Sequence, residues 1–341
     1  MAFDNLHLEK GMYRQTGKSF SQVLESLDPS ENYRGTALEG SDAFQRQIKR
    51  FGIRLSGPGS DSVEKFFSTL ESAVLFPEYV ARTVRAGMEG SDVLDKIIAT
   101  RTMIDAMDYR SIYTDPEAGE LEPANVGEGA RIPTTQIRSK DHLINLNKRG
   151  RMLVASYESI RFQKLDLFAV TLRQIGAAIR KSLVSDAIGV LLDGDGNGNP
   201  AASYTIGTSP ISGTAGSLSY EALCDFWAQF DPYELDTMIV PTSVATGLLK
   251  LPEFQNPMAG MNFQGSGRMI TPLGAQVVRT DAAPQGKILG LDHRYALEMV
   301  QAGDVMVEYD KLIDRQLERA AITTLAGFSK IYEDASAVLV I

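Results

Sequence analysis

The stretch LDLFAVTLRQIGAAIRKSLVSDAIGVLLDGDGNGNP, residues 165–200, decides how the rest of the sequence is interpreted. Between residues 162 and 192, apolar residues recur every three or four positions and no proline interrupts them. That spacing is typical of one face of an α-helix. The sequence therefore predicts a helix over 162–192, about 45 Å long at 1.5 Å per residue. We interpret it as the structural backbone of a large subunit, because its apolar stripe repeats closer to 3.6 residues than to the 3.5 of a coiled coil.

The residues after this helix resemble a calcium-binding loop but lack its last ligand. Asp193, Asp195, Asn197 and Gly198 match the opening of an EF-hand. The pattern requires a glutamate at its twelfth position, and that position is Tyr204. Glycine and asparagine tolerate left-handed backbone and commonly end helices. We therefore interpret this segment as a helix stop, with an adventitious cation as the alternative.

Residues 115–150 are punctuated by proline and glycine and contain few large apolar residues. Their charge is segregated, with acidic residues first and basic residues second: Glu117, Glu120, Glu122 and Glu128, then Arg131, Arg138, Lys140, Lys148 and Arg149. Loops of this length in a compact domain are usually functional or disordered. We predict an extended hairpin whose charged parts meet complementary charge on a neighbour. The following RMLVASYESI, residues 151–160, reads as a strand that returns to the body.

Residues 1–60 are polar and broken by glycines, and only short helical patches such as Phe20–Leu27 appear. We predict an arm that buries little surface by itself. Apolar residues between Val63 and Val74 then have the spacing of an amphipathic helix, and Pro77 is predicted to end it. A short helix over Glu78–Met88 and a helix, or a helix and a strand, over Asp92–Met107 follow.

Residues 219–301 read as an α/β unit. We predict helices at Tyr220–Phe230, capped by Ser219, and at Thr242–Leu251, capped by Thr242 or Ser243. Predicted strands lie at 237–240, 275–279, 287–289 and 295–300. Residues 203–218 read as a loop or linker, and a glycine- and methionine-rich loop covers 252–272. Strand-like runs fill 304–341, which indicates a first domain that is resumed after the α/β unit.

The overall composition excludes several classes of protein. The chain has 341 residues and a net charge of −9, which argues against a dedicated nucleic-acid binder. It has no apolar run of about 18 residues that could span a membrane, and its first residues lack the core of a signal peptide. We therefore expect a cytoplasmic protein. The single cysteine, Cys224, cannot form an internal disulfide.

The candidate chemical motifs are all incomplete. The GKS at Gly17–Ser19 has Met12 where a phosphate loop needs glycine, and Gly127-x-Gly129 lacks a third glycine. Cys224 is predicted to be a buried, inert thiol. The three histidines are far apart in the sequence and leave little for metal binding or acid–base chemistry: His7, His142 and His293. We interpret His142 and His293 as surface residues. We predict no catalytic, cofactor-binding or metal-ligating residue, and no enzyme activity.

The order of these elements resembles the tailed-bacteriophage major capsid protein family, with its α+β HK-ninety-seven-type fold. The resemblance rests on RMLVASYESI with the long helix and LLDGDGNGNP, on IVPTSVATGLLKL, GAQVVRT and GKILGLD, and on AGFSKIYEDASAVLVI. FPEYV at Phe76–Val80 is also similar to N-terminal arms of the family. It implies an N-terminal arm (1–60), a helical region leading into the peripheral (P) domain (61–114), an extended loop or E-loop (115–150), a P-domain with the spine helix (151–202), an axial (A) domain (203–303) and P-domain return strands (304–341).

The resemblance implies a structural protein that self-assembles as pentamers and hexamers into an icosahedral shell around double-stranded DNA. Its implied partners are other copies of itself, a separate scaffolding protein, a portal and a decoration protein, with DNA bound only non-specifically and no membrane. We expect it in the virion capsid, assembled in the host bacterial cytoplasm. Because the chain begins at Met1, we expect no cleaved scaffolding segment. Lysine–asparagine cross-links are not supported, because no asparagine follows Asn262.

Two alternatives compete with this interpretation. An encapsulin-type nanocompartment shell would have the same fold, but it would normally be shorter at the N-terminus and would enclose a cargo enzyme. A soluble enzyme with a site in residues 219–301 would belong to a different class. That alternative requires convergent polar groups, and the sequence does not indicate any.

Overall fold

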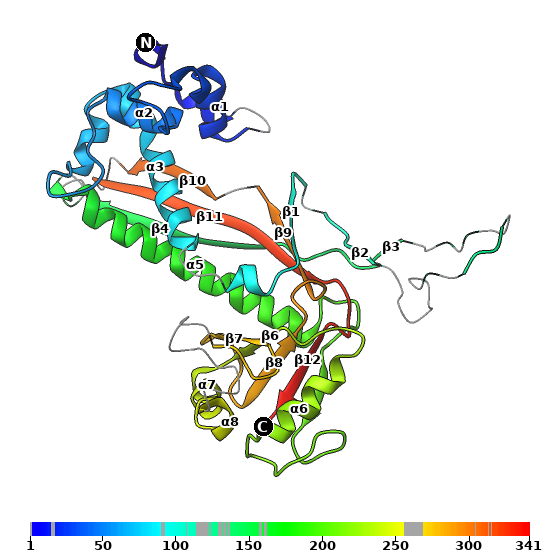
Figure 1. Ribbon diagram of the computed structural model, residues 1–341. Coiled ribbons are helices and arrows are strands. Elements are labelled where there is room, and N and C mark those ends of the chain that lie inside the picture. The colour runs from blue at the N-terminus through cyan, green and yellow to red at the C-terminus, as the bar shows by residue number, and fades with distance from the viewer. Residues whose placement is uncertain are drawn as a thin grey trace. The chain divides into compact units, whose positions relative to one another are not determined.

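The chain forms two compact units, and each is discontinuous in sequence (Figure 1). The computed structural model describes residues 2–14, 18–89, 93–106, 108–113, 123, 125–128, 132, 134, 137–156, 159, 162–255, 269–303, 305–312, 314 and 316–341. The first unit comprises Met1–Ser91, Lys148–Arg180 and Gly303–Leu325. The second comprises Asp92–Asn147, Lys181–Ala302 and Ala326–Ile341. Each is described below on its own.

The N-terminal 60 residues fold as short helices with buried side chains. Both α1 and α2 begin with a capping box, formed by Ser19 with Gln22 and by Asp42 with Gln45. The guanidinium of Arg46 is fully buried and its Nε donates to Asp28 at 2.7 Å. The elements are η1 (Ala2–Asn5), η2 (Lys10–Arg14), α1 (Phe20–Leu27), η3 (Ser30–Tyr33) and α2 (Ala43–Arg50).

The prediction that residues 1–60 bury little surface by themselves is wrong, because Phe3, Tyr33 and Leu38 form a buried cluster within them. Phe20, Leu24 and Phe44 are buried, and the hydroxyl of Tyr13 donates to the carbonyl of Val74 in the same unit. Composition misled the prediction because polar residues here satisfy one another inside the fold, so few apolar residues suffice.

Helix α3 (Leu70–Glu89) follows η4 (Val63–Phe67) and continues through Pro77. The predicted break at Pro77 does not occur. Proline leaves the carbonyl four residues earlier without its helical donor. Buried residues on both sides of it, including Phe76, Tyr79 and Val80, hold the helix in place by packing.

The predicted long helix is confirmed as α5, Leu165–Asp193 (Figure 1). In the first unit its backbone packs directly on α3. A Cβ built on Gly176 would lie 2.1 Å from the carbonyl oxygen of Val84, and one on Gly87 would lie 2.3 Å from that of Arg173. Arg180 Nη1 then donates to the carbonyls of Gly87 at 3.1 Å and of Met88 at 2.7 Å. Those carbonyls belong to the last turn of α3, where intrahelical donors are absent.

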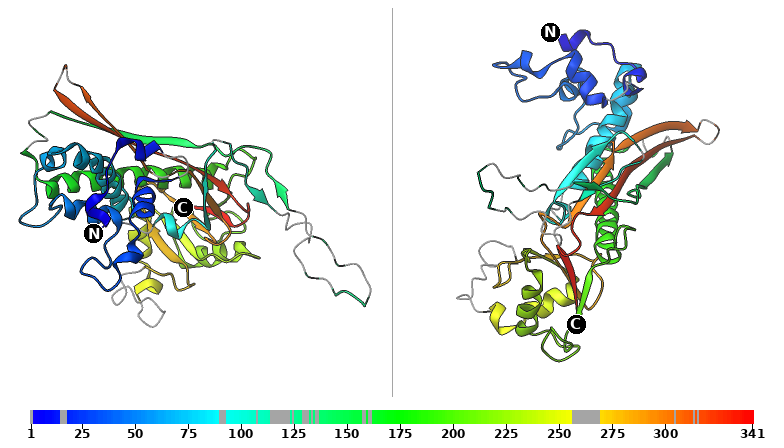
Figure 2. Two further views of the ribbon diagram at one scale, coloured as in Figure 1. Left: turned by 90° about the horizontal axis from the view of Figure 1, so that it is seen from above. Right: turned by 90° about the vertical axis from the view of Figure 1, so that its right-hand side faces the viewer.

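Strand β11 (Leu317–Lys330) runs from the first unit into the second. In the first unit it pairs antiparallel with β10 (Met306–Leu312), and the ribbon can be followed in Figure 2. It also pairs with β4 (Asn147–Ser156). In the second unit its last residues pair antiparallel with β9 (Leu297–Ala302), which pairs parallel with β1 (Thr100–Ile104). The two runs predicted at 320–327 and 328–332 are thus one strand.

The second unit contains another five-stranded sheet, in the order β5-β12-β8-β6-β7. Phe226 and Phe230 pack against this sheet, in a core that includes Ile288 and Leu339. The strands are β5 (Ala202–Thr205), β6 (Thr237–Val240), β7 (Gln276–Arg279), β8 (Lys287–Leu291) and β12 (Ser336–Val340). The helices are η5 (Leu94–Lys96), α6 (Tyr220–Trp227), η6 (Ala228–Phe230), α7 (Thr242–Leu248) and α8 (Pro252–Gln255).

Several predictions for this part of the chain need correction. The last strand, β12, was expected with the P-domain return strands, but it pairs with β5 and β8. Ser336 to Leu339 are all buried, so this strand needs neighbours on both faces and both edges. Strand β5 lies in the segment predicted as a loop, and β9 pairs outside the α/β sheet. Helix α6 is capped by Ser219 as predicted, whereas α7 starts after Pro241 without a side-chain cap.

The segment between β1 and β4 contributes two short strands, one near each of its ends, and these pair with each other. Strand β2 (Ile112–Tyr113) pairs antiparallel with β3 (Arg138–Ser139), as a hairpin requires. Most of residues 114–136, and residues 256–268 of the predicted axial loop, lie outside the described residues. Among the helices that are described, none combines the length and apolar character needed to cross a membrane.

Candidate functional site

The base of the 115–150 segment is a hydrogen-bonded polar region of the second unit. We call residues 108–113 and 138–146 the loop root, and residues 114–137 the loop. Two buried carboxylates contact the root. Glu298 belongs to β9, and Asp195, whose side chain is 3% exposed, follows α5.

Glu298 accepts hydrogen bonds from three hydroxyl groups. Thr102 Oγ1 lies 2.6 Å and Tyr109 OH 3.0 Å from Oε1, and Ser111 Oγ lies 2.5 Å from Oε2. The glutamate is 5% exposed. A buried carboxylate is costly unless donors replace its water, and hydrogen bonds to an ionised acceptor are among the strongest. Burial, and next the charge of Glu298, raise the pKa of Tyr109, so its hydroxyl remains a donor.

Asp195 is placed by the glycine-rich helix stop. Gly194 and Gly196 have φ values of 87° and 93°, the left-handed backbone that favours glycine. Asp195 Oδ2 accepts from Ser329 Oγ at 2.7 Å and from Lys140 Nζ at 3.0 Å. The backbone N–H of Lys330 donates to the same oxygen at 3.1 Å.

The other oxygen of Asp195 is also occupied. Asn197 donates to Oδ1 from its backbone N–H at 3.3 Å and from Nδ2 at 2.8 Å. Burial alone would raise the pKa of Asp195, but the hydrogen bonds from Asn197, Ser329 and Lys140 outweigh it and hold the pKa well below its usual range. This use of Asp195 agrees with its interpretation as part of a helix stop.

The root has two limbs, residues 108–113 and residues 138–146, and these are also hydrogen-bonded to each other. The N–H of Lys140 donates to the carbonyl of Ser111 at 2.9 Å, and the N–H of Ile144 donates to that of Tyr109 at 2.9 Å. On the next residue, Asn145, the carbonyl lies so close to β11 that a Cβ on Gly327 would be 2.6 Å from it. The root is therefore held by backbone as well as side-chain contacts.

Lys330 lies beside this network with its side chain fully buried. Its Nζ has no hydrogen-bond partner among the described residues. Burial lowers the pKa of this amine to about 8. The carbonyl of Lys330, by contrast, accepts from Lys140 Nζ.

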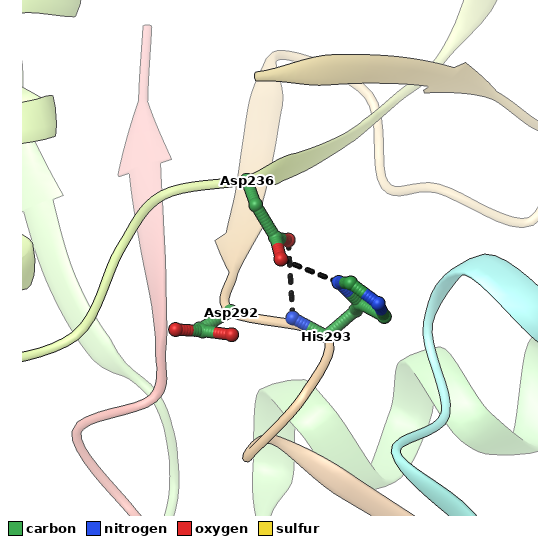
Figure 3. A group of neighbouring side chains, drawn as sticks. All are labelled: Asp236, Asp292 and His293. Atoms are coloured by element: carbon green, nitrogen blue, oxygen red, sulfur yellow. Dashed lines mark hydrogen bonds and ion pairs between the residues drawn. The ribbon is translucent and has the colours of Figure 1, made fainter. Parts of the chain in front are cut away.

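A second polar cluster surrounds His293 (Figure 3). Asp236 accepts from the His293 backbone N–H at 3.1 Å and contacts Nδ1 of its ring. Asp292 is buried, and both of its oxygens accept from Arg294, at 2.9 Å from Nε and 2.8 Å from Nη2. Figure 3 shows the Asp292 carboxylate extending away from the His293 ring. The carboxylates therefore fix the turn between β8 and β9. One ligand atom from each of Asp236, Asp292 and His293 lies within 4.8 Å of the others, so the three residues could also hold a metal ion.

The remaining singled-out residues lie in separate surroundings. His7 is exposed and pairs with Glu71 at 2.9 Å. His142 is exposed, and its N–H donates to Asn197 at 3.2 Å. Cys224 is half-buried, so the predicted full burial is wrong. Ser19 of the GKS motif caps α1, and Gly17 lies outside the described residues. His293 is partly buried and paired, which the sequence analysis missed because Asp236 is 57 residues away.

Several large apolar side chains are exposed instead of buried. On α5, Leu167 and Val170 are three residues apart and so share a face of the helix. On β4, Met152 and Val154 alternate onto one face of the strand. In the loop, Ile132 is 72% and Ile137 is 69% exposed. Exposed apolar residues that occur together are typical of interaction surfaces.

Comparisons with known proteins agree with this picture. A model of the phage capsid protein family matches residues 140–328. The virus-like particle from Pyrococcus furiosus is 15% identical with a TM-score of 0.52, over 77% of this chain and 99% of that chain. The capsid of the native GTA particle is 14% identical with a TM-score of 0.53, over 73% of this chain and 89% of that chain. No curated protein matches the sequence.

These findings define first a class, proteins with the HK-ninety-seven-type α+β fold. Because the family model covers more than half of the chain, the chain belongs to the phage capsid protein family. It is a structural, non-enzymatic capsid protein of the virion. The family and fold predicted from the order of elements are confirmed.

Proposed function

We propose that this chain forms pentamers and hexamers that close an icosahedral shell around double-stranded DNA, and that its loop contacts a neighbouring subunit. The observation that carries the proposal is the exposure of Val126, Ile132 and Ile137, three of the loop residues that the structure describes. Burying one such side chain contributes about 1.5–3 kcal/mol. Repetition of the contact around a closed shell multiplies a weak contact into stable assembly.

The remaining partners belong to the same proposal. A net charge of −9 suits a container that holds its DNA without binding it tightly. A separate scaffolding protein, a portal and a decoration protein complete the particle, which assembles in the host bacterial cytoplasm. The domain assignment carried by the resemblance, with residues 115–150 as the E-loop and 151–202 as the spine of the P-domain, is part of the proposal.

The proposal is tested by replacing residues 114–137 with a glycine–serine linker of equal length, which leaves β2 and β3 in place. We expect the wild-type chain, expressed in bacteria, to sediment as megadalton particles that appear as shells in electron micrographs. The replaced chain should remain a soluble subunit with the same thermal unfolding midpoint. Shells of normal size from the replaced chain would contradict the proposed role of the loop.

A shell that encloses protein cargo instead of DNA is the second candidate, and the likeness to a virus-like particle is the observation that favours it. The two proposed functions differ in what the particle encloses. Particles isolated from the native host should contain nuclease-resistant DNA of constant length. Particles that contain a single co-purifying enzyme and no DNA would support the nanocompartment.

A further inference from the structure

We propose that Glu298 and Asp195 are positioning residues that fix the loop root in the free subunit, so that the loop meets a neighbouring subunit already oriented. This inference rests on the proposed function, because it concerns the same loop. It assigns a role to two buried carboxylates that lie outside the loop itself.

The first carboxylate holds the limb that leads into the loop. Thr102, Tyr109 and Ser111 all donate hydroxyls to Glu298, and the three positions span the chain from β1 to the start of β2. Glu298 itself sits on β9, which has a hydrogen-bonded strand on each side. The sheet fixes the position of a side chain on a central strand. The hydrogen bonds to Glu298 therefore fix the position of the limb relative to the sheet.

The second carboxylate holds the limb that leaves the loop. Lys140 follows β3 directly, and its side chain is only 8% exposed. Its Nζ reaches Asp195 and the carbonyl of Lys330, so one amine joins the limb both to the helix stop and to the end of β11. Asp195 is in turn held by Asn197 and Ser329. A rigid helix stop therefore determines where the second limb begins.

The consequence is preorganisation. Ordering a flexible segment at the moment of association costs conformational entropy, and a segment fixed in advance avoids much of that cost. Because each subunit of a shell makes the same contact, a small change per loop is repeated many times. Loosening the root should therefore raise the concentration needed for assembly without removing any atom that touches the neighbour.

The test removes two of the three hydroxyl donors to Glu298 and leaves both carboxylates in place. In the double variant Tyr109→Phe with Ser111→Ala, we expect amide hydrogen exchange of residues 108–113 and 138–146 to rise tenfold or more in the free subunit. The protein concentration at which shells appear, measured by sedimentation, should rise about tenfold. Exchange in β6 and β8 should be unchanged, which shows that the second unit remains folded.

Two controls separate positioning from general stability. Asp236→Asn removes a carboxylate interaction of the same unit at the His293 turn, away from the root, and should leave the assembly concentration unchanged. A disulfide between β2 and β3 should restore assembly of the double variant. It is introduced by Ile112→Cys and Ser139→Cys, because these two residues pair directly across the strands. Assembly should return when this pair is oxidised and be lost again on reduction.

The outcomes distinguish this inference from the proposed function. If the linker-replaced chain fails to assemble but the double variant assembles like the wild type, the positioning role is overturned and the loop contact stands. If Asp236→Asn impairs assembly as much as the double variant, or the disulfide does not restore assembly of the double variant, positioning is also overturned. If the linker-replaced chain assembles normally, the proposed function itself fails.

Discussion

Single residues in this subunit carry buried charge in two contrasting ways. Arg46 is fully enclosed but meets Asp28, Ser30 and the carbonyl of Ser41. Lys330 is equally enclosed, yet its amine has no partner among the residues that the structure describes. The first arrangement is compensated, and the second reduces the stability of the fold.

Replacing Lys330 with methionine should therefore stabilise the subunit. The pKa of the amine falls from 10.5 to about 8 on folding, so the penalty is fully present below about pH 8 and disappears as pH rises through 10.5. We expect Lys330→Met to gain about 3 kcal/mol at neutral pH, and clearly less near pH 9.5. Urea unfolding at both pH values measures this. An equal gain at both values would show that packing, not charge, is responsible.

Replacing Arg46 with alanine should have the opposite effect. It leaves the carboxylate of Asp28 buried with Tyr33 OH, at 2.6 Å, as its one remaining side-chain donor among the described residues. Breaking a buried pair from one side costs about 3–5 kcal/mol. Thermal unfolding of Arg46→Ala measures the loss. Arg34→Ala, at an exposed pair with Glu31, is the control and should leave the midpoint unchanged.

At the scale of elements, α5 offers a matched pair of glycines. Gly176 faces the carbonyl of Val84, whereas nothing lies within 4 Å of a Cβ on Gly189. Alanine in a helix is favoured over glycine by about 1 kcal/mol. Gly189→Ala should therefore stabilise the subunit by up to about that amount. Gly176→Ala should destabilise it by at least about 2 kcal/mol, because rigid backbone must move. Equal effects of the two variants on the unfolding midpoint would contradict the direct contact of α3 with α5.

The elements also show what sequence can predict. The limits of α5 and β6 followed from local period and capping, which are properties of the segments themselves. The pairing of β12 with β5 and β8 was not predictable, because it joins residues distant in the sequence, such as Ala337 with Ala202 and Val338 with Leu289, by backbone bonds that any sequence can make. Likewise Asp195 was correctly placed in a helix stop, but its bonds to Lys140 and Ser329 depend on how distant segments meet. Glu298, in the middle of a strand-like run, gave no signal.

At the scale of the whole molecule, the proposed function depends on apolar side chains that remain exposed in the free subunit. Ile137 is 69% exposed beside β3, so it contributes nothing to the core of its own chain. Ile137→Asp should leave the free energy of unfolding within about 0.5 kcal/mol of the wild type. On a neighbouring subunit, however, the same charge would need to be buried without a partner, which is costly. We therefore expect sedimentation to show free subunits at concentrations where the wild type forms shells.

The control for that prediction is a charge placed on an exposed apolar residue outside the loop. Leu167 on α5 is 60% exposed, and Leu167→Asp should be equally harmless to folding. If only Ile137→Asp blocks assembly, the contact belongs to the loop. If both block it, α5 also contributes to the interface between subunits. If Ile137→Asp forms shells as readily as the wild type, its side chain stays in water after assembly, and the energy that joins subunits comes from elsewhere.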